Sequence, residues 1–524
     1  MSKVIVRSIF IIFMLFTRVS QADVLDWIVV NGRLVDGTGA TERIASVGAV
    51  NGRLRVFEHG VDLPAARHKI DAAGMVIAPG FIDMHTHARA DLLSKDKNGV
   101  SNYLTQGVTT LAIGNDGDGT PNIADRFALL AGGGTGTNVV QFVGHGSLRR
   151  QVVGNDNRLA TEAELLEMEQ ALDQSFAEGA AGLSLGLFYT PGNYAPTSEV
   201  VRLCKVAARW ERICEAHIRS ESSRGEGVFA AVEEMLDIAR QSGVAIHFAH
   251  IKVLGKDVWG ESDRVISMIS KAQAEGLHVT ADQYPWIASS TQLKNAILSA
   301  EWLAGTRSAW RDRLQNPANE GAVIEDLRQG IARRGGGERL MLVSTGDVAI
   351  EGLMLSEVAE RWNVSPELAA LKLLREAPPR VVSFNMNESD VENFMAEPWV
   401  ATSSDGTDGH PRKYASFPRK YARYVLERQI LTLEQFVERS SALPARILGL
   451  NDRGVITSGN IADVIVFDPR RYKDAATFEQ WDRLTPGVEW MFINGKPVIE
   501  HGRYLGALVG RNLALPAKSD RVDP

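Results

Sequence analysis

Apolar and polar positions along the chain fall into two different patterns. From about Val24 to Met75, and again in "ADVIVFDP" and "VEWMFINGKPVIEHGRYLG" toward the other end, short apolar runs are bounded by Asn-Gly or other glycine-rich turns. This spacing is typical of β-hairpins. Because two distant segments share the pattern, we expect one small β-domain built from both ends of the chain.

Between these segments, apolar strand-like runs alternate with helical stretches such as residues 162–178 and 224–242. This alternation predicts βαβ units with a parallel sheet, and eight such strands predict a barrel. The eight strand candidates are, in order, "FIDMHTH", "TTLAIGND", "NVVQFVGHG", "AGLSLGLFY", "ICEAHIRS", "VAIHFAHIKV", "HVTADQYPW" and "WVATSSDG".

One long interruption, residues 287–398, separates the seventh and eighth strand candidates. It is rich in helix-forming residues and is broken at "LQNPANE" and "ARRGGGER". We therefore expect an inserted helical subdomain near the mouth of the barrel. A lid over the site and a purely structural insertion both fit this pattern.

Composition adds the broad class. The chain has 524 residues, of which 44% are apolar and 23% charged, with a net charge of -7. These values are those of a soluble globular protein, and the chain lacks the basic character of nucleic-acid-binding proteins. The two cysteines, Cys204 and Cys214, have no metal-binding spacing, so we expect ordinary buried thiols, with a single disulfide as the alternative.

The first 22 residues have a different character. Lys3 and Arg7 precede the apolar run "SIFIIFMLFT", and "RVSQAD" follows with small residues at positions 20 and 22. This order predicts a secretory signal peptide in residues 1–22, removed on export, with the periplasm as the expected destination. The alternative is an uncleaved membrane anchor, although the apolar run is short for a membrane span.

The first chemical signal is the stretch "APGFIDMHTHARADL", in which His85 and His87 flank one threonine directly after a strand-like run. In an extended strand, residues i and i+2 point to the same side, so both imidazoles face one point. Two neutral imidazoles suit one metal ion, although this short motif alone is weak.

Polar side chains end most of the other strand candidates as well, where barrel enzymes carry their active sites. Histidines and carboxylates that converge on one rim predict a site for one or two divalent metal ions, most naturally zinc. The residues at these strand ends are Asp116, His145, His217, His250, Tyr284 and Asp405.

The ordered set of motifs resembles the amidohydrolase superfamily and, within it, the D-aminoacylase (N-acyl-D-amino-acid deacylase) family. The similar segments are "APGFIDMHTH", "EAHIRSE", "FAHIKVLGK", "TSSDG", "GLSLGLFYTPGNYAP" and "LPARILGLNDRGVITSGNIADVIVFDP", and they cover almost the whole chain after the signal. The resemblance implies an α/β fold: a (β/α)8 TIM barrel with a small β-sandwich and a helical insertion before the eighth strand. The expected divisions are the β-sandwich in 23–77 and 456–524, the barrel in 78–286 and 399–455, and the insertion in 287–398.

The resemblance also implies the metal ligands, which are His85, His87, His217 and His250. The family usually has a cysteine ligand in the second-strand turn, where this chain has Asp116. A carboxylate also binds or bridges zinc but is a harder ligand than a thiolate. No lysine ends "GLSLGL", so Asp116 is the candidate bridge, and the number of metal ions, one or two, stays open.

For the reaction, the resemblance implies that metal-activated hydroxide attacks the amide carbonyl while Asp405 acts as general acid and base. His145 is a candidate for stabilising the oxyanion. Turn capping by Asp405 is the structural alternative.

The resemblance also implies how the substrate is recognised. In the family, a Lys, a Tyr and an Arg hold the α-carboxylate of the substrate, and the matching residues here are Lys252, Tyr284 and Arg412. Structural ion pairs are the alternative for these residues. The side-chain pocket has three further candidates, namely Arg219, Glu221 and Ser289.

The predicted activity is therefore hydrolysis of N-acyl-D-amino acids, or of small peptides ending in a D-residue, with a small-molecule substrate that carries a free carboxylate. The alternatives are a hydrolase of cyclic amides or lactones from the same superfamily, and a catalytically inactive binding protein.

Overall fold

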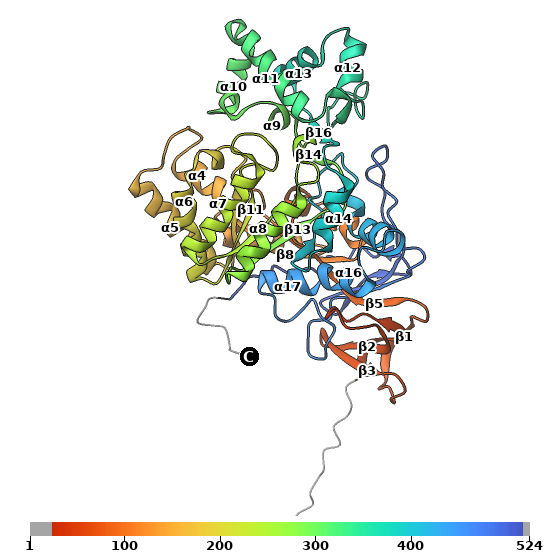
Figure 1. The fold of residues 1–524 in the computed structure, drawn as a ribbon. Helices are drawn as coiled ribbons and strands as arrows, with labels where there is room; N and C mark the ends of the chain where they lie inside the picture. The colour runs from red at the N-terminus through yellow and green to blue at the C-terminus, as the bar shows by residue number, and fades with distance from the viewer. Residues whose placement is uncertain (1–23, 517–524) are drawn as a thin grey trace, which may run out of the picture.

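A nine-stranded sheet occupies one end of the molecule in the computed structural model, which describes residues 24–516 (Figure 1). The strand order is β21-β20-β19-β18-β5-β1-β2-β3, and β4 pairs with β1. The rings of Trp27 and Phe492 stack in its apolar layer with centroids 3.9 Å apart, so the two chain ends share one core. The strands are β1 (Leu25–Leu34), β2 (Arg43–Val50), β3 (Arg53–Glu58), β4 (Ala66–Asp71), β5 (Val76–Pro79), β18 (Val464–Phe467), β19 (Val488–Ile493), β20 (Lys496–Glu500) and β21 (Arg503–Tyr504).

Asn-Gly pairs have two different roles in this sheet. Asn51–Gly52 joins β2 to β3 and Asn494–Gly495 joins β19 to β20, with positive φ at all four residues, as tight hairpin turns require. Asn31, with φ of 61°, lies inside β1, where the register against β2 shifts between Val29 and Gly32. The prediction of a turn there is wrong, because this pair forms a bulge within one long strand.

Each of the eight predicted central segments contains a strand, and all of these strands pair in parallel. One sheet has the order β6-β7-β8, and a second has the order β17-β13-β12-β11-β10-β9. The strands are β6 (Phe81–Asp83), β7 (Val108–Ile113), β8 (Asn138–Gln141), β9 (Val143–Gly144), β10 (Gly182–Gly186), β11 (Ile213–His217), β12 (Ala245–Phe248), β13 (Val279–Gln283) and β17 (Val400–Thr402).

The two parallel sheets are connected at both of their edges. Only Phe142 separates β8 from β9, so one continuous segment joins the sheets at that edge. At the other edge, Thr86 and Gly406 form an isolated parallel bridge, and the Asp405 amide donates a 2.9 Å hydrogen bond to the His85 carbonyl. The carboxyl ends of β6 and β17 therefore lie side by side.

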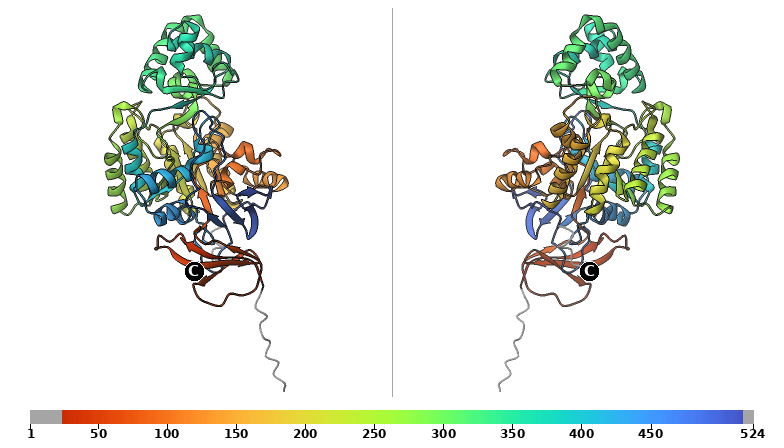
Figure 2. Two further views of the ribbon diagram at one scale, coloured as in Figure 1. Left: turned by 90° about the vertical axis from the view of Figure 1, so that its right-hand side faces the viewer. Right: turned by 90° about the vertical axis from the view of Figure 1, so that its left-hand side faces the viewer.

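Helices connect these strands and cover their outer faces (Figure 2). The predicted helix at 162–178 is α5, and a capping box formed by Thr161 and Glu164 lies at its N-terminus. The predicted helix at 224–242 is α7, which Gly243 ends in a left-handed conformation. These helices are α1 (Arg89–Leu92), α2 (Ser101–Leu104), α3 (Ile123–Gly133), α4 (His145–Val152), α5 (Glu162–Ala177), α6 (Thr197–Arg209), α7 (Gly227–Ser242), α8 (Ser262–Ala274), α14 (Glu388–Ala396), α15 (Arg412–Arg419), α16 (Leu433–Ser440) and α17 (Ala442–Leu448).

The long interruption before β17 projects from the opposite end of the molecule to the nine-stranded sheet (Figures 1 and 2). It is not wholly helical, because the apolar runs "LMLV" and "RVVS" form two strands of an antiparallel sheet in the order β14-β16-β15. Helix α14 lies instead beside α8, where Asn393 donates a hydrogen bond to Ser262. The elements of the projection are β14 (Ser289–Gln292), α9 (Leu293–Ile297), α10 (Arg307–Gln315), α11 (Glu320–Arg333), β15 (Leu340–Val343), α12 (Leu355–Trp362), α13 (Pro366–Glu376) and β16 (Arg380–Ser383).

Cys204 on α6 and Cys214 on β11 form a disulfide, and both are fully buried. The preferred expectation of two free thiols is therefore wrong. The sequence spacing of the two cysteines carries no signal for this pairing, since it depends on how α6 packs against β11.

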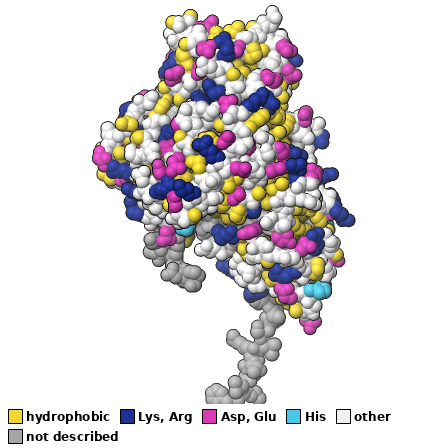
Figure 3. All heavy atoms as spheres, in the orientation of Figure 1, with side chains coloured by type: hydrophobic (Ala, Val, Ile, Leu, Met, Phe, Trp, Pro, Cys, Tyr) yellow, Lys and Arg dark blue, Asp and Glu magenta, His cyan; other side chains and the backbone are white. Residues whose placement is uncertain are grey.

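Charged side chains of both signs are mixed over the face shown in Figure 3. Within residues 24–516, no helix combines the length and the apolar character needed to cross a bilayer. The predicted signal peptide, residues 1–22, lies outside the described residues.

Candidate metal centre and active site

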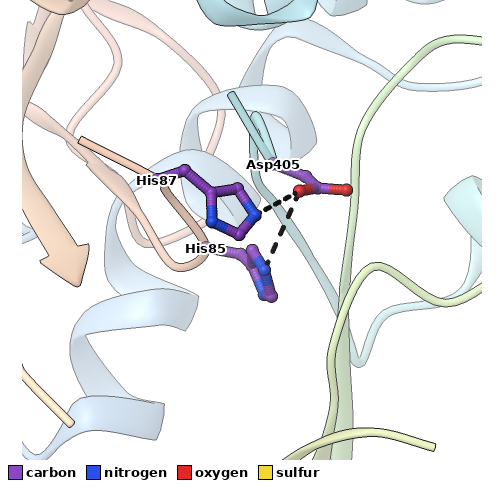
Figure 4. A group of neighbouring side chains, drawn as sticks. All are labelled: His85, His87 and Asp405. Carbon is purple, nitrogen blue, oxygen red and sulfur yellow. Dashed lines mark hydrogen bonds and ion pairs between the residues drawn. The ribbon is translucent and has the colours of Figure 1, made fainter. Parts of the chain in front are cut away.

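His85, His87 and Asp405 come together where β6 and β17 end (Figure 4). The Oδ1 atom of Asp405 lies 3.0 Å from His87 Nε2 and 3.9 Å from His85 Nε2. His85 is fully buried, whereas the His87 side chain is 36% exposed. Both imidazoles thus face one carboxylate oxygen, although His85 and His87 lie beyond Asp83, where β6 ends, and not within an extended strand.

Asp116, after β7, lies at the centre of the histidines. Its Oδ1 atom is 3.4 Å from His85 Nε2, 3.4 Å from His217 Nδ1 and 3.3 Å from His250 Nε2. Its Oδ2 atom is 3.6 Å from His87 Nε2. Burial alone would raise the pKa of Asp116, but the surrounding imidazoles outweigh it and hold that pKa well below its usual range.

The backbone beside Asp116 fits closely against β10. A Cβ atom at Gly186, the last residue of β10, would lie 2.1 Å from the Asp116 carbonyl oxygen. Only glycine leaves room for this approach. Asp116 therefore packs its backbone against the end of β10, and its side chain extends from the end of β7 toward the histidines.

Three residues of this cluster have left-handed backbone conformations. The φ angles are 58° at Asp116, 35° at His250 and 46° at Asp405. This backbone conformation is unfavourable for residues other than glycine, although Asp and Asn tolerate it better than the others do. Strain of this kind concentrates at functional sites, where the surrounding structure holds a side chain in place.

Lys252 and Glu221 lie behind His250. Lys252 Nζ is 2.5 Å from Glu221 Oε1 and 2.6 Å from His250 Nδ1. Burial alone would raise the pKa of Glu221, but Lys252 and His217 hold it well below its usual range. The Lys252 charge is thus already paired with a carboxylate.

Arg412 and Tyr284 lie behind Asp405. Arg412 Nη1 is 2.7 Å from Asp405 Oδ2, and its guanidinium carbon is 4.7 Å from the centroid of the Tyr284 ring. Both side chains are buried. Burial alone would raise the pKa of Asp405, but Arg412 and then His87 hold it well below its usual range.

A cavity of about 480 Å³ opens over this cluster, within the size range of small-molecule sites. Several candidate site residues do not line it, namely His85, His145, Tyr284, Arg412 and Arg219, which pairs with Glu234. Those that line it are His87, Asp116, His217, Glu221, His250, Lys252, Ser289 and Asp405.

His145 is not part of the cluster. Its Nε2 atom lies 2.8 Å from Glu199 Oε1, and Arg149 Nη1 lies 2.5 Å from the other oxygen of that carboxylate. All three side chains are almost fully buried, at most 2% exposed. The structure therefore does not place His145 where it can contact an oxyanion in the cavity, because this ion-paired network holds it in the core.

The chain matches no protein-family model. It is 32% identical to the N-acyl-D-glutamate deacylase of Alcaligenes xylosoxydans xylosoxydans in an alignment of 497 residues that covers 90% of this chain and 93% of that protein. The chain belongs to the N-acyl-D-amino-acid deacylase family of amidohydrolases.

Solved structures of this family have the same fold. The N-acyl-D-glutamate deacylase of Bordetella bronchiseptica, complexed with zinc and a phosphonate mimic of the tetrahedral intermediate, is 32% identical. It has a TM-score of 0.79, with 94% of this chain and all of that chain covered. A D-aminoacylase studied for its binuclear metal centre also has a TM-score of 0.79, with 29% identity and coverage of 93% of this chain and 99% of its own.

Glu215 also belongs to the site of this deacylase-family protein, although it was not predicted from the sequence. It is fully buried on β11, with Oε1 3.0 Å from His85 Nδ1 and 3.2 Å from Asn115 Nδ2. A signal was present, because Glu215 precedes His217 by two residues and so shares its side of the strand. A carboxylate that contacts the far nitrogen of an imidazole fixes the tautomer and orientation of a metal ligand.

A second buried carboxylate, that of Asp282, contacts the backbone of His250. Asp282 Oδ1 accepts a 3.0 Å hydrogen bond from the His250 amide, and its Oδ2 lies 2.9 Å from His247 Nε2. Asp282 thus holds the strained backbone of His250.

Proposed function

We propose that this protein is a metal-dependent amidohydrolase that hydrolyses the amide bond of N-acyl-D-amino acids or of small peptides ending in a D-residue. One observation carries the proposal: four imidazoles and two carboxylates cluster at the carboxyl ends of parallel strands, and all of them except His85 line one cavity. They do so in a chain related along nearly its whole length to an enzyme named for this activity.

The residues fit one or two divalent metal ions, with zinc as the first choice because imidazole and carboxylate are its ligands. His85 Nε2 is buried without a hydrogen-bond partner among the described residues, although it faces Asp116. Two groups of ligand atoms, each within 4.8 Å of one another, share His250. One is His85, Asp116 and His250; the other is His217, Glu221 and His250.

Asp116 would bridge two metal ions, since its two oxygens face different imidazoles. Zinc, when bound, supplies Lewis-acid activation of water and of the amide carbonyl. The binuclear centre of the related D-aminoacylase and the zinc in the related deacylase support this assignment.

Asp405 is the general acid and base. Its Oδ2 atom is held by Arg412, so Oδ1, beside His87 and the cavity, is the atom that takes the proton from water and returns it to the departing nitrogen. Because Arg412 makes a charge-assisted contact with one oxygen, the other keeps a fixed direction.

The free carboxylate of the substrate binds beside Lys252, which lines the cavity, with Tyr284 and Arg412 behind it. Burial raises the pKa of Tyr284 well above its usual value, so its phenol remains a neutral donor. Arg412 pairs with Asp405 and does not line the cavity, so its proposed role is to hold the general base and to add positive charge behind the substrate carboxylate.

The eight parallel strands form a single (β/α)8 barrel in this proposal, made of residues 78–286 and 399–455, with 287–398 inserted. The bridge between Thr86 and Gly406 supports closure of the barrel. The nine-stranded sheet corresponds to the β-sandwich of residues 23–77 and 456–524. Residues 1–22 direct export to the periplasm, and the buried disulfide suits an oxidising compartment.

Turnover of a substrate panel tests the proposal. The panel contains N-acetyl-D-amino acids, their L-enantiomers, L-D dipeptides, dihydroorotate and simple lactones, assayed with zinc-loaded protein. We expect release of free amine from the D-compounds, loss of this activity with a chelator, and its return with zinc. Hydrolysis of the cyclic compounds alone would overturn the proposal in favour of the alternative cyclic-amide or lactone hydrolase.

A further inference from the structure

One wall of the cavity carries positive charge that the metal centre does not use. This wall comes from the loop after β11 and from the projecting insertion, which includes the "RRGGG" turn that ends α11. The cations that line it are Arg224, Lys294, Arg333, Arg334 and Arg380, and they are called the cationic wall below.

No carboxylate of the described chain pairs with the cationic wall. Among residues 24–516, none of the five makes an ion pair within 4.0 Å. Across the same cavity, Arg89 and Arg150 share Asp118 at 3.0 and 3.6 Å. The contrast shows that the surplus charge is confined to one side of the cavity.

The members of the cationic wall are held by neutral groups only. Arg380 Nε is buried without a hydrogen-bond partner among the described residues. Arg334 Nε donates to the Ala296 carbonyl at 3.2 Å, and Arg224 Nη2 donates to the Leu298 carbonyl at 2.6 Å. Burial lowers the pKa of Arg334 to about 10 and also lowers that of Arg380. All five side chains are partly buried. A partly buried charge without a partner is unfavourable, so these positions favour an incoming anion.

The pairing of β14 with β16 brings two members of this wall, Arg380 and Lys294, close together. Arg380 is the first residue of β16, directly opposite Gln292 of β14 in the antiparallel register. Lys294 lies two residues further on, in α9. A second cavity of about 690 Å³ adjoins the first and shares Arg224, Lys294 and Arg380 with it. The wall thus continues beyond the space that the amide and the α-carboxylate need.

We propose that the cationic wall binds a second carboxylate of the substrate, carried either by the side chain of an acidic D-residue or by the acyl group. The inference rests on the proposed function and specifies that the preferred substrate carries a second negative charge. Lys252, already paired with Glu221, has no part in this second subsite.

Matched pairs of substrates separate this subsite from recognition of the α-carboxylate. One pair is N-acetyl-D-glutamate and N-acetyl-D-glutamine; the other is N-succinyl-D-alanine and its side-chain amide. We expect the carboxylate member of at least one pair to have the higher kcat/KM, by tenfold or more. The pair that shows the preference identifies whether the side chain or the acyl group carries the second carboxylate.

Arg380→Met and Arg334→Met should each narrow this ratio roughly tenfold to hundredfold, the range for one lost hydrogen bond to a charged group. Arg380→Lys should keep part of the preference because the charge remains. Arg328→Met is the control, since Arg328 lies on the outer side of α11, pairs with Glu325 and does not line the cavity. Thermal unfolding of each variant checks that the fold is retained.

Equal or faster turnover of the amide members would overturn the inference while leaving the proposed function intact. A preference that survives both Met variants and equals that of Arg328→Met would also overturn it. Absence of turnover for all four substrates by zinc-loaded protein would instead contradict the proposed function itself.

Discussion

Arg412 Nη1 lies 2.7 Å from Asp405 Oδ2, and the guanidinium is fully buried. The same Asp405 presents its other oxygen to His87 at 3.0 Å. One side chain of this pair was expected to hold the substrate and the other to transfer a proton. Their contact makes the two roles interdependent.

Arg412→Met tests this relationship. A residue that only binds the substrate carboxylate equally in the ground and transition states would raise KM and leave kcat unchanged. We expect kcat to fall as well, by about tenfold or more, because Asp405 loses the contact that fixes its direction. Steady-state kinetics with an N-acetyl-D-amino acid measures the split, and a change in KM alone would contradict the positioning role.

Replacing the proposed metal ligands should distinguish the histidines that bind metal from other buried histidines. His217→Ala and His250→Ala should each lower the bound zinc below one equivalent per chain, since each imidazole lies within 3.4 Å of Asp116. His145→Gln is the matched control, because His145 pairs with Glu199 away from the cavity and should retain the full metal content. Elemental analysis measures this, and full occupancy in both Ala variants would place the metal elsewhere.

Glu215→Gln should weaken metal binding without removing a ligand. The carboxylate contacts His85 Nδ1 at 3.0 Å, so its loss frees the imidazole to change tautomer and orientation. Partners of this kind typically contribute 10- to 100-fold in metal affinity. Competition with a chelator measures the affinity, and an unchanged value would assign Glu215 to packing alone.

Glu199→Gln should destabilise the fold and spare the metal. Its removal leaves Arg149, 0% exposed, without its ion-pair partner, which typically costs about 3–5 kcal/mol. Burial alone would raise the pKa of Glu199, but His145 and Arg149 lower it below its usual value of 4.5. The stability that this carboxylate contributes is therefore present above pH 4.5 and is lost as the pH falls through its lower folded-state pKa.

Denaturant unfolding between pH 3 and pH 7 measures this difference. Wild type should lose its advantage over Glu199→Gln as the pH falls below about 4.5. A difference in stability that stays constant over that range would show that the charge of Glu199 is not responsible.

The strands and the polar residues at their ends followed from periodicity, because a parallel strand between helices has a simple pattern. The placement of His85 and His87 needed more than the alternation of a strand, because both lie beyond the end of β6. The turns at Asn51–Gly52 and Asn494–Gly495 needed only a dipeptide. Asn31–Gly32 shows the limit of that signal, since the strand continues through it. Whether such a pair bends the chain back or bulges depends on the neighbouring strands.

Pairings between different elements of the fold lay outside what the sequence pattern contains. The contact of Arg412 with Asp405, the enclosure of His145 by Glu199 and the disulfide between Cys204 and Cys214 depend on packing between elements. The cationic wall is a similar case. Its members come from four separate segments of the chain, in the loop after β11 and across the insertion, and only the fold brings them to one cavity.

The central claim is that Asp405 moves the proton while the histidines hold the metal. Asparagine tolerates the left-handed backbone at this position, so Asp405→Asn removes the charge with little change in φ preference. The deciding measurement is the rate at which zinc-loaded Asp405→Asn releases amine from the best N-acyl-D-amino acid, relative to wild type with equal metal content. We predict a loss of roughly a hundredfold to ten-thousandfold; a rate within a few-fold of wild type would contradict the account.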